Sequence, residues 1–228
     1  MDLAAIYRDR FGRMGKDTRD RVWAVLCRSY FDDVIGPNRS VLELACGYGE
    51  FINNIAASRK LAIDINPDAR SHVNDDVEFM EADAAEIPVP DASVDVVFAS
   101  NFLEHLPDKA TLNRVFGEVR RALGDGGHFI IMGPNIRFAY REYWDWFDHF
   151  LPLSDRSLCE GLSQAGFTIV RCTPQFLPVT MDSKLPKPDW MIRLYLAIPM
   201  AWRIFGKQFL VVARKEGGPS AALNAQRR

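Results

Sequence analysis

Residues 41–51 read VLELACGYGEF, and this stretch decides the fold because a short apolar run leads directly into two closely spaced glycines. Apart from Glu43 the run is apolar, which is typical of a strand covered by helices on both sides. Gly47 and Gly49 form a G-x-G pair, which we expect at a strand-to-helix junction where backbone N–H groups approach a ligand. The pair alone is weak evidence, because ordinary turns also use glycine.

Further apolar runs follow at residues 61–65, 77–80, 94–100, 128–132, 167–170 and 209–213. Apolar side chains repeat every three or four positions in residues 23–34 and 112–123, which predicts two helices, the second ending at Gly124. Ser154 and Gly166 are typical end residues of a third helix between them. This alternation predicts an α/β fold with a doubly wound, seven-stranded, mostly parallel sheet. Ligands bind at the carboxyl ends of the strands in such sheets.

The composition is that of an ordinary globular protein, because 48% of the 228 residues are hydrophobic and 25% are charged. It excludes disordered, collagen-like and coiled-coil proteins. The formal net charge is −2, so no nucleic-acid partner is expected, since such proteins usually carry a basic excess. We expect one domain over residues 1–215, beginning with a helical segment at residues 1–36, and a flexible tail at residues 216–228.

The cysteines and the first residues bear on the cellular compartment. The four cysteines form no C-x-x-C pair, so no metal site is expected. The amino-terminal residues are charged throughout and lack the apolar segment of a signal peptide. These features predict a reduced, cytoplasmic protein. The sequence leaves open whether the amino-terminal helix covers the ligand or mediates a homodimer.

Two segments interrupt the alternation, at residues 134–153 and 174–208, and both follow strands at the expected ligand-binding edge. We therefore expect substrate-side insertions. In the first insertion, four aromatic residues are spaced as on one face of a helix: Tyr140, Tyr143, Trp144 and Phe147. This spacing favours a small local core, and the alternative is a wall against which a sugar or lipid packs.

The second insertion contains an apolar stretch at residues 190–205 with several basic residues nearby. It is too short and too interrupted to be a convincing transmembrane segment. We favour a lid packed across the site. The alternative is a peripheral contact with the inner face of a membrane, which an apolar helix with tryptophan and basic residues can make.

Carboxylates lie in the first expected strand and at the ends of the second and third. Asp64 lies 21 residues after Glu43, where it can accept both ribose hydroxyls of a nucleoside, and Asp83 is placed to contact an adenine edge. A dinucleotide is disfavoured, because Ile52 occupies the position of the third glycine of its fingerprint. The loop carries Glu43 and Glu50 and no basic residue, which disfavours pyrophosphate and fits a cationic sulfonium nucleoside.

In their order along the chain, these segments resemble the motifs of class I S-adenosylmethionine-dependent methyltransferases. VLELACGYGEF resembles the first motif, AIDIN the second, EADAAEIP the third and VDVVFASNFLEHL the fourth, and RRALGDGGHFIIMGPN resembles the segment that follows. Together they cover residues 41–135. Ala45 is a departure, because the family has glycine there. GYGEFINNI and PNIRFAYREYWDWFDHFLPLSDRSL also resemble methyltransferases found with bacterial polysaccharide and glycolipid biosynthesis.

The resemblance implies S-adenosyl-L-methionine as the cofactor and S-adenosyl-L-homocysteine as its product. Carried over by position, it implies that the cofactor is held by Glu43, Ala45, Gly47, Tyr48, Gly49, Asp64, Ile65, Asp83, Ala84, Asn101 and Phe102. Within this set the carboxylates hold the ribose and adenine, Ile65 packs on the adenine, and Asn101 and Phe102 line the methionine end.

Methyl transfer from a sulfonium is an in-line displacement that requires alignment and no metal. A hydroxyl acceptor must lose its proton, so a general base helps, and histidine is the natural candidate. His105 follows the fourth strand, and His149 neighbours Asp148; we expect one of them to act as the base. For each, a structural hydrogen-bonding role is the alternative. His128 begins a strand and is expected to be structural.

The sequence therefore predicts a methyltransferase that O-methylates a hydroxyl of a sugar, glycolipid or other small molecule. N- or C-methylation of a small metabolite remains an alternative. A binding subunit that has lost its chemistry is a second alternative, which the departure at Ala45 keeps open. A nucleotide-dependent oxidoreductase is a third, opposed by Ile52 and by the acidic loop.

Overall fold

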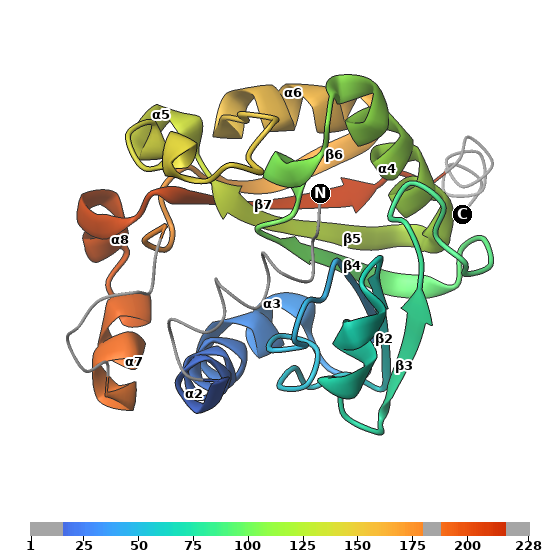
Figure 1. Cartoon of the computed structure of the whole chain (residues 1–228), viewed down its shortest axis with the longest axis horizontal. Helices are drawn as coiled ribbons and strands as arrows, with labels where there is room; N and C mark the ends of the chain where they lie inside the picture. The colour runs from blue at the N-terminus through green and yellow to red at the C-terminus, as the bar shows by residue number, and fades with distance from the viewer. Residues whose placement is uncertain (1–15, 180–187, 218–228) are drawn as a thin grey trace, which may run out of the picture.

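The computed structural model describes residues 16–179 and 188–217, and its centre is a seven-stranded sheet in the order β3-β2-β1-β4-β5-β7-β6 (Figure 1). The strands are β1 (Ser40–Leu44), β2 (Arg59–Asp64), β3 (Val77–Glu81), β4 (Val94–Ser100), β5 (Leu123–Pro134), β6 (Phe167–Thr173) and β7 (Gln208–Lys215). Strands β1 to β5 are parallel to one another, and β7 runs antiparallel between β5 and β6. The predicted α/β fold with a mostly parallel sheet is confirmed.

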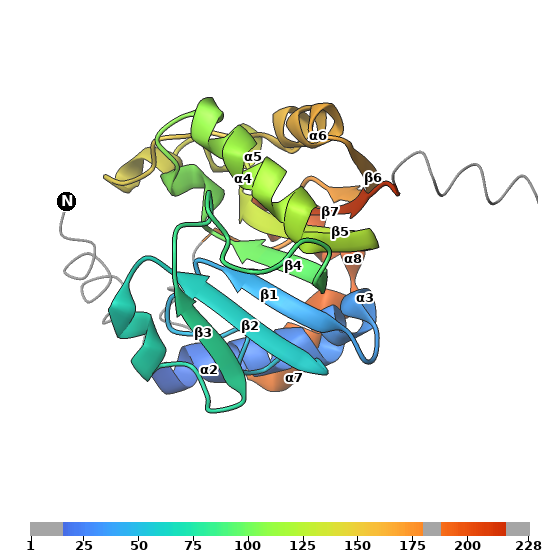
Figure 2. The ribbon, with the colours of Figure 1, turned by 90° about the vertical axis from the view of Figure 1, so that its right-hand side faces the viewer.

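Helices cover both faces of the sheet (Figure 2). One face carries α4 (Lys109–Ala122) and α6 (Asp155–Gln164). The other carries α2 (Lys16–Leu26), the π-helix η1 (Cys27–Phe31), α3 (Asp32–Ile35) and α7 (Asp189–Ala197). Shorter elements are η2 (Pro67–Ser71), η3 (Leu103–His105), α5 (Ile136–Ala139), η4 (Tyr143–Asp145) and α8 (Pro199–Phe205).

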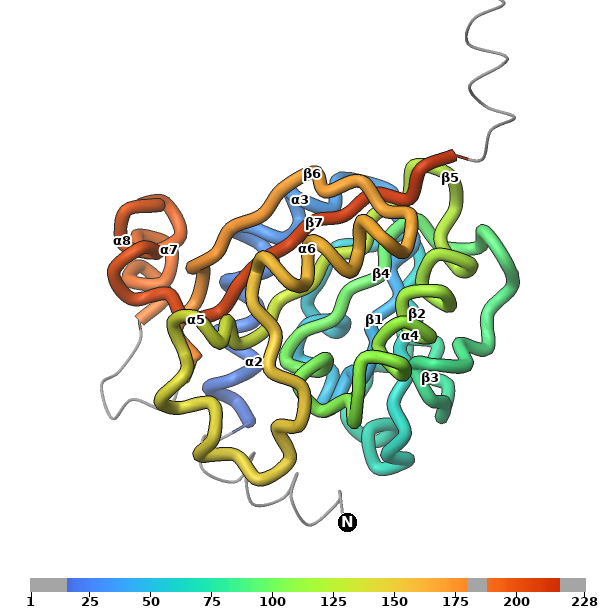
Figure 3. Tube along the Cα trace, turned by 90° about the horizontal axis from the view of Figure 1, so that it is seen from above, coloured from blue at the N-terminus to red at the C-terminus, as the bar shows by residue number. Residues whose placement is uncertain are grey.

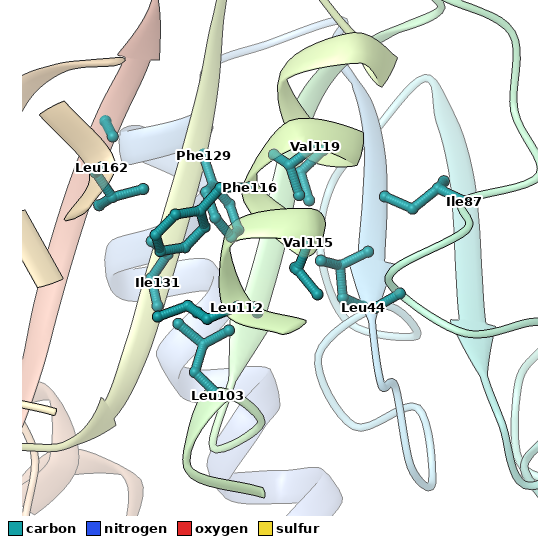
Figure 4. Packing of buried hydrophobic residues seen from close by; sticks show 14 of the residues in the cluster. Leu44, Ile87, Leu103, Leu112, Val115, Phe116, Val119, Phe129, Ile131 and Leu162 are labelled. Atoms are coloured by element: carbon teal, nitrogen blue, oxygen red, sulfur yellow. The ribbon is translucent and has the colours of Figure 1, made fainter. Parts of the chain in front are cut away.

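The core lies in two layers, one against each face, because successive strand residues point to opposite sides. On one side, α4 packs Leu112, Val115, Phe116 and Val119 against Phe129 and Ile131 of β5 (Figure 4). On the other side, α2 and η1 pack against alternating strand residues and against Phe51, whose ring stacks on Phe98 at 3.6 Å between centroids. Packed apolar side chains therefore cover both faces of the sheet.

The third predicted helix has the expected ends. Ser154 caps α6 with a capping box, and Gly166 follows with φ of 84°. Helix α4, however, ends at Ala122 and not at Gly124. The next residue, Leu123, is already extended and pairs with Val94, so strand pairing sets the boundary before the glycine.

The expected helix after the G-x-G pair is absent from residues 46–58, which form a series of turns. Only isolated helical bonds occur there, such as that from the Asn53 N–H to the Gly49 carbonyl. Asn53 and Asn54 direct their side-chain amides to the carbonyls of His72 and Glu50, and such bonds compete with a regular helix. The expected helix N-terminus, with its N–H groups directed toward a ligand, therefore does not form.

The first insertion is mostly irregular, and its aromatic residues do not form the expected local core. Tyr143 is buried, whereas Tyr140, Trp144 and Phe147 are exposed. The reason is that α5 ends at Ala139, and the following chain is tied to the loop after β4 by the N–H groups of Phe150 and Leu151, which donate to the Glu104 carbonyl (Figure 3). Because this segment is not a continuous helix, side chains spaced three or four residues apart do not share one face.

The second insertion forms α7 and α8, and residues 180–187 of it lie outside the described residues. Most of the expected tail, residues 218–228, and residues 1–15 of the amino-terminal segment lie outside them as well. Trp202 of α8 packs on Tyr30 and Phe176 and donates its indole N–H to the Tyr195 carbonyl at 2.8 Å. Within the described ranges, no helix is both long and apolar enough to span a bilayer.

Candidate active site

The carboxyl ends of β1, β2 and β4 meet under the loop that carries the G-x-G pair. Ala45, Gly47 and Gly49 all adopt positive φ, at 50°, 54° and 72°. The left-handed region strains any residue with a Cβ atom, so Ala45 stands where glycine is preferred. A Cβ on Gly49 would lie 3.0 Å from both Asn53 Nδ2 and Val73 Cγ1, so this glycine permits close packing of the loop.

The sequence predicted that Glu43 and Glu50 make this loop acidic, but each carboxylate is bonded within the protein. The Glu43 carboxylate is buried and accepts the Ile52 N–H at 3.1 Å. Burial, and secondly the nearby Glu50 charge, hold the pKa of Glu43 well above its ordinary value. Glu50 is paired with Arg19 of α2 at 2.7 Å. The positive charge of Arg19, from the amino-terminal helix, therefore offsets one negative charge of the loop.

Asp64 is fixed by the backbone around it. Its carboxylate accepts the N–H groups of Gly47 and Asn66, each at 2.8 Å, and it is 2% exposed. Burial raises the pKa of Asp64, and these N–H groups oppose that rise. A carboxylate offers about four acceptor sites, so these bonds do not use its full acceptor capacity. The bond to Gly47 joins the loop after β1 to the end of β2.

The remaining predicted cofactor residues line the same edge. Asp83 is exposed, and its carboxylate accepts the Ala85 N–H at 2.8 Å, while Ala84 is buried beside it. Ile65 is 55% exposed, an unusual position for isoleucine that leaves its side chain free to pack on a flat ring. After β4, Asn101 is exposed with φ of 49° and Phe102 is half-buried.

Tyr48 lies at the edge of the loop, in contact with an imidazole ring and near a guanidinium group. Its ring contacts the His72 imidazole at 3.9 Å between centroids, and the Arg19 guanidinium lies 5.6 Å from its centre. Tyr48 was predicted from the sequence, but Arg19 and His72 were not. Both approach the loop from segments outside the motifs, so no spacing pattern marks them.

His105 and His149 come together at the far side of this edge, with ring centroids 5.0 Å apart. The His105 Nδ1–H donates to the Asp148 carbonyl at 2.9 Å, and the Asp148 carboxylate lies 3.2 Å from the same nitrogen. Burial lowers the pKa of His105, but the bonds and charges of Asp148 and Glu104 outweigh it, and the pKa lies above the ordinary value. Asp148 thus orients His105, whereas the sequence suggested it for its neighbour His149.

Glu104 is the functional candidate that sequence reasoning missed. It is buried between the two histidines and Gly133, and one ligand atom from each of Glu104, His105 and His149 lies within 4.8 Å of the others. The signal was its position in the string NFLEHLP, next to His105. Only the folding of residues 143–150 over that string reveals it as part of a cluster.

Comparison with known proteins agrees with this geometry. Residues 42–131 match the family model described as a methyltransferase domain. A "probable S-adenosylmethionine-dependent methyltransferase" of Mycobacterium tuberculosis is 40% identical over 102 residues, which cover 42% of this chain and 36% of that protein. The 27-O-demethylrifamycin SV methyltransferase of Amycolatopsis mediterranei is 35% identical over 103 residues, covering 40% and 37%. The matched stretch thus spans about a third of each relative.

A solved structure extends the likeness to the whole fold. The crystal structure of an S-adenosylmethionine-dependent methyltransferase from Archaeoglobus fulgidus superposes with a TM-score of 0.66 at 21% identity, covering 94% of this chain and 100% of that one. At that identity the match shows the fold alone. The residues that match the family model include the G-x-G loop, Asp64 and Asp83. Residues 42–131 therefore match a methyltransferase domain, and a relative that shares part of this chain is named as a probable S-adenosylmethionine-dependent methyltransferase.

Proposed function

We propose that the protein transfers the methyl group of S-adenosylmethionine to a hydroxyl of a sugar, a glycolipid or another small molecule. The observation that carries this proposal is the cluster of Glu104, His105, Asp148 and His149. It lies after β4, beside the residues that would line the methionine end of the cofactor. A hydroxyl bound there meets groups that can hold it and accept its proton.

The donor residues would bind and orient the cofactor. Asp64 would accept the ribose hydroxyls, Asp83 and Ala84 would contact the adenine edge, and Ile65 would pack on its face. Asn101 and Phe102 would hold the methionine end, and Glu43 lies beneath the loop. Alignment of acceptor, methyl carbon and sulfur then supplies most of the catalysis, as in other displacements held at short range.

The acceptor residues would complete the reaction. The hydroxyl oxygen forms a bond to the methyl carbon while the methyl–sulfur bond breaks, and the sulfur keeps the electron pair. The hydroxyl proton passes to an imidazole, for which His149 or His105 is placed. The relative from Amycolatopsis is named for an O-demethylated acceptor, which supports oxygen as the atom methylated here. Exposed Trp144 and Phe147 can stack on sugar rings.

A lipid-linked acceptor is favoured by the outer faces of α7 and α8. Their inner side chains Ile192, Leu196 and Trp202 are buried, yet their outer surface is also apolar. It exposes Trp190, Met191, Leu194, Ile198, Met200, Ile204 and Phe205. Arg193 and Arg203 are exposed among them. Apolar side chains beside cations suit a bilayer surface with anionic headgroups, so we propose that this face rests on one, in place of the lid expected earlier.

Calorimetric titration with S-adenosylhomocysteine tests the proposal, with NAD as the control ligand. Micromolar binding is expected, with none for NAD. Asp64→Asn should weaken it by roughly 10- to 150-fold, because a charged acceptor of hydroxyl hydrogen bonds is lost. Asp95→Asn, at the opposite end of the sheet, should not. Transfer of a labelled methyl group to sugars and polyprenyl-linked glycans then identifies the acceptor. Absent binding by the unmodified protein would contradict the proposal.

A further inference from the structure

The cluster around Glu104 has the composition of a metal site. It offers two imidazoles and one carboxylate, and their ligand atoms lie within 4.8 Å of one another. Two histidines and one carboxylate bind several divalent transition metals in proteins. Ligand atoms about 2.1 Å from a common ion lie roughly 3–4 Å apart, so small side-chain rotations would close the set.

The orientation of His105 is that of a metal ligand. Its Nδ1–H is engaged by the Asp148 carbonyl at 2.9 Å and lies 3.2 Å from the Asp148 carboxylate. Histidines that bind metals usually donate the second ring N–H to a carboxylate or carbonyl, which fixes the ring and leaves the other nitrogen to coordinate. The Asp148 carboxylate is itself buried. Nε2 of His105 is thereby left for a ligand.

A second, independent observation comes from Tyr143. This side chain is fully buried, its ring lies 4.6 Å from that of His149, and its hydroxyl has no hydrogen-bond partner among the described residues. A buried hydroxyl without a partner costs about 1–3 kcal/mol. Proteins keep such a group where a ligand, an ion or ordered water satisfies it. The cluster thus has an unmet polar group at its edge.

We propose that Glu104, His105 and His149 bind one divalent transition-metal ion, with Asp148 as the positioning residue of His105. This inference rests on the proposed function for its purpose, since the ion would bind the acceptor hydroxyl. Coordination lowers the pKa of a bound hydroxyl, as it does for bound water. With both imidazoles bound to the ion, neither serves as the base named under the proposed function. The oxygen would lose its proton to solvent, and would then form the bond to the methyl carbon while the methyl–sulfur bond breaks. The proposal replaces the metal-free site expected from the sequence.

Metal binding is measured on the full-length protein after treatment with a chelator and dialysis. Titration with Co²⁺, followed by visible absorption, is expected to give one ion per chain and to be reversed by Zn²⁺. Glu104→Gln and His149→Ala should abolish the spectrum, and Asp148→Asn should weaken binding by about 10- to 100-fold. His128→Ala is the matched control and should bind as the unmodified protein does. Unchanged binding in the cluster variants, or no stoichiometric binding at all, would overturn the proposal.

Two further measurements distinguish loss of the metal site from unfolding, and failure of the metal proposal from failure of the proposed function. Each variant must still bind S-adenosylhomocysteine, so that a lost spectrum cannot reflect unfolding. In the unmodified protein, Mn²⁺ should broaden the methyl signal of bound ¹³C-methyl S-adenosylmethionine, because the cluster would lie next to that group. Metal binding without cofactor binding would refute the proposed function and leave the metal site intact. Cofactor binding without metal binding would refute the metal site and leave the proposed function standing.

Discussion

The proposed site has two halves, one for the methyl donor and one for the acceptor, and they are built in different ways. The donor half, at the ends of β1, β2 and β3, holds its carboxylates with nearby backbone: Gly47 N–H bonds Asp64, and Ala85 N–H bonds Asp83. The acceptor half joins His105 to Asp148, 43 residues away, through an irregular insertion. Strand ends are fixed by the sheet, whereas an insertion can change with little effect on the core. On the proposed function, the donor half can therefore stay the same between related proteins, while the acceptor half varies with the acceptor.

The largest effect is expected from substitutions on the outer face of α7 and α8, which should lower affinity for membranes. Ile204 is 67% and Phe205 60% exposed, and burying each in a bilayer interface contributes up to about 1.5–3 kcal/mol. Ile204→Glu/Phe205→Glu should therefore lower affinity for vesicles with anionic lipid by about 100-fold or more, measured by co-sedimentation. Val170→Glu, on a similarly exposed apolar residue of β6, is the control. Equal loss in both variants would argue against a specific face.

The amino-terminal helix is expected to hold the donor loop through one ion pair. Arg19 and Glu50 have side chains only 12% and 9% exposed, so Arg19→Met leaves a carboxylate desolvated without its partner. The expected loss of stability is about 3 kcal/mol in urea unfolding, together with weaker binding of S-adenosylhomocysteine. Arg19→Met/Glu50→Gln should recover much of it. Arg59→Met, in an exposed pair with Glu78, should cost less than about 1 kcal/mol.

How far the sequence predicts each half follows from the same contrast. The strands, and the carboxylates at their ends, were predicted because apolar runs and turn residues are local signals. Arg19 was missed because it reaches the loop from another element. Glu104 was missed, and Asp148 was assigned to His149 in place of His105, because only the folded insertion brings residues 143–150 against the loop after β4. The helix expected after Gly49 failed for a related reason: side-chain bonds of Asn53 and Asn54 compete with it.

Close packing of the donor loop is tested at Gly49. Alanine there combines an unfavourable φ of 72° with contacts of 3.0 Å to Asn53 and Val73. The expected destabilisation is about 2–3 kcal/mol, from backbone strain and overpacking together. Gly126→Ala isolates the backbone part, because φ is 75° and no atom lies within 4 Å of its Cβ. It should cost only about 1 kcal/mol. Equal thermal unfolding of the two variants would mean that packing contributes nothing.

The smallest effect on stability concerns Ala45, where the sequence departs from the motif that it resembles. At φ of 50° an alanine is strained by about 1 kcal/mol, and glycine is not. Glycine also gains entropy in the unfolded chain, so Ala45→Gly should stabilise the protein by about 0.5 kcal/mol or less. Ala110→Gly, in the first turn of α4, should destabilise it instead. Affinity for S-adenosylhomocysteine separates two roles for Ala45. Unchanged affinity means that alanine is merely tolerated, whereas a gain means that its methyl group crowds the donor pocket.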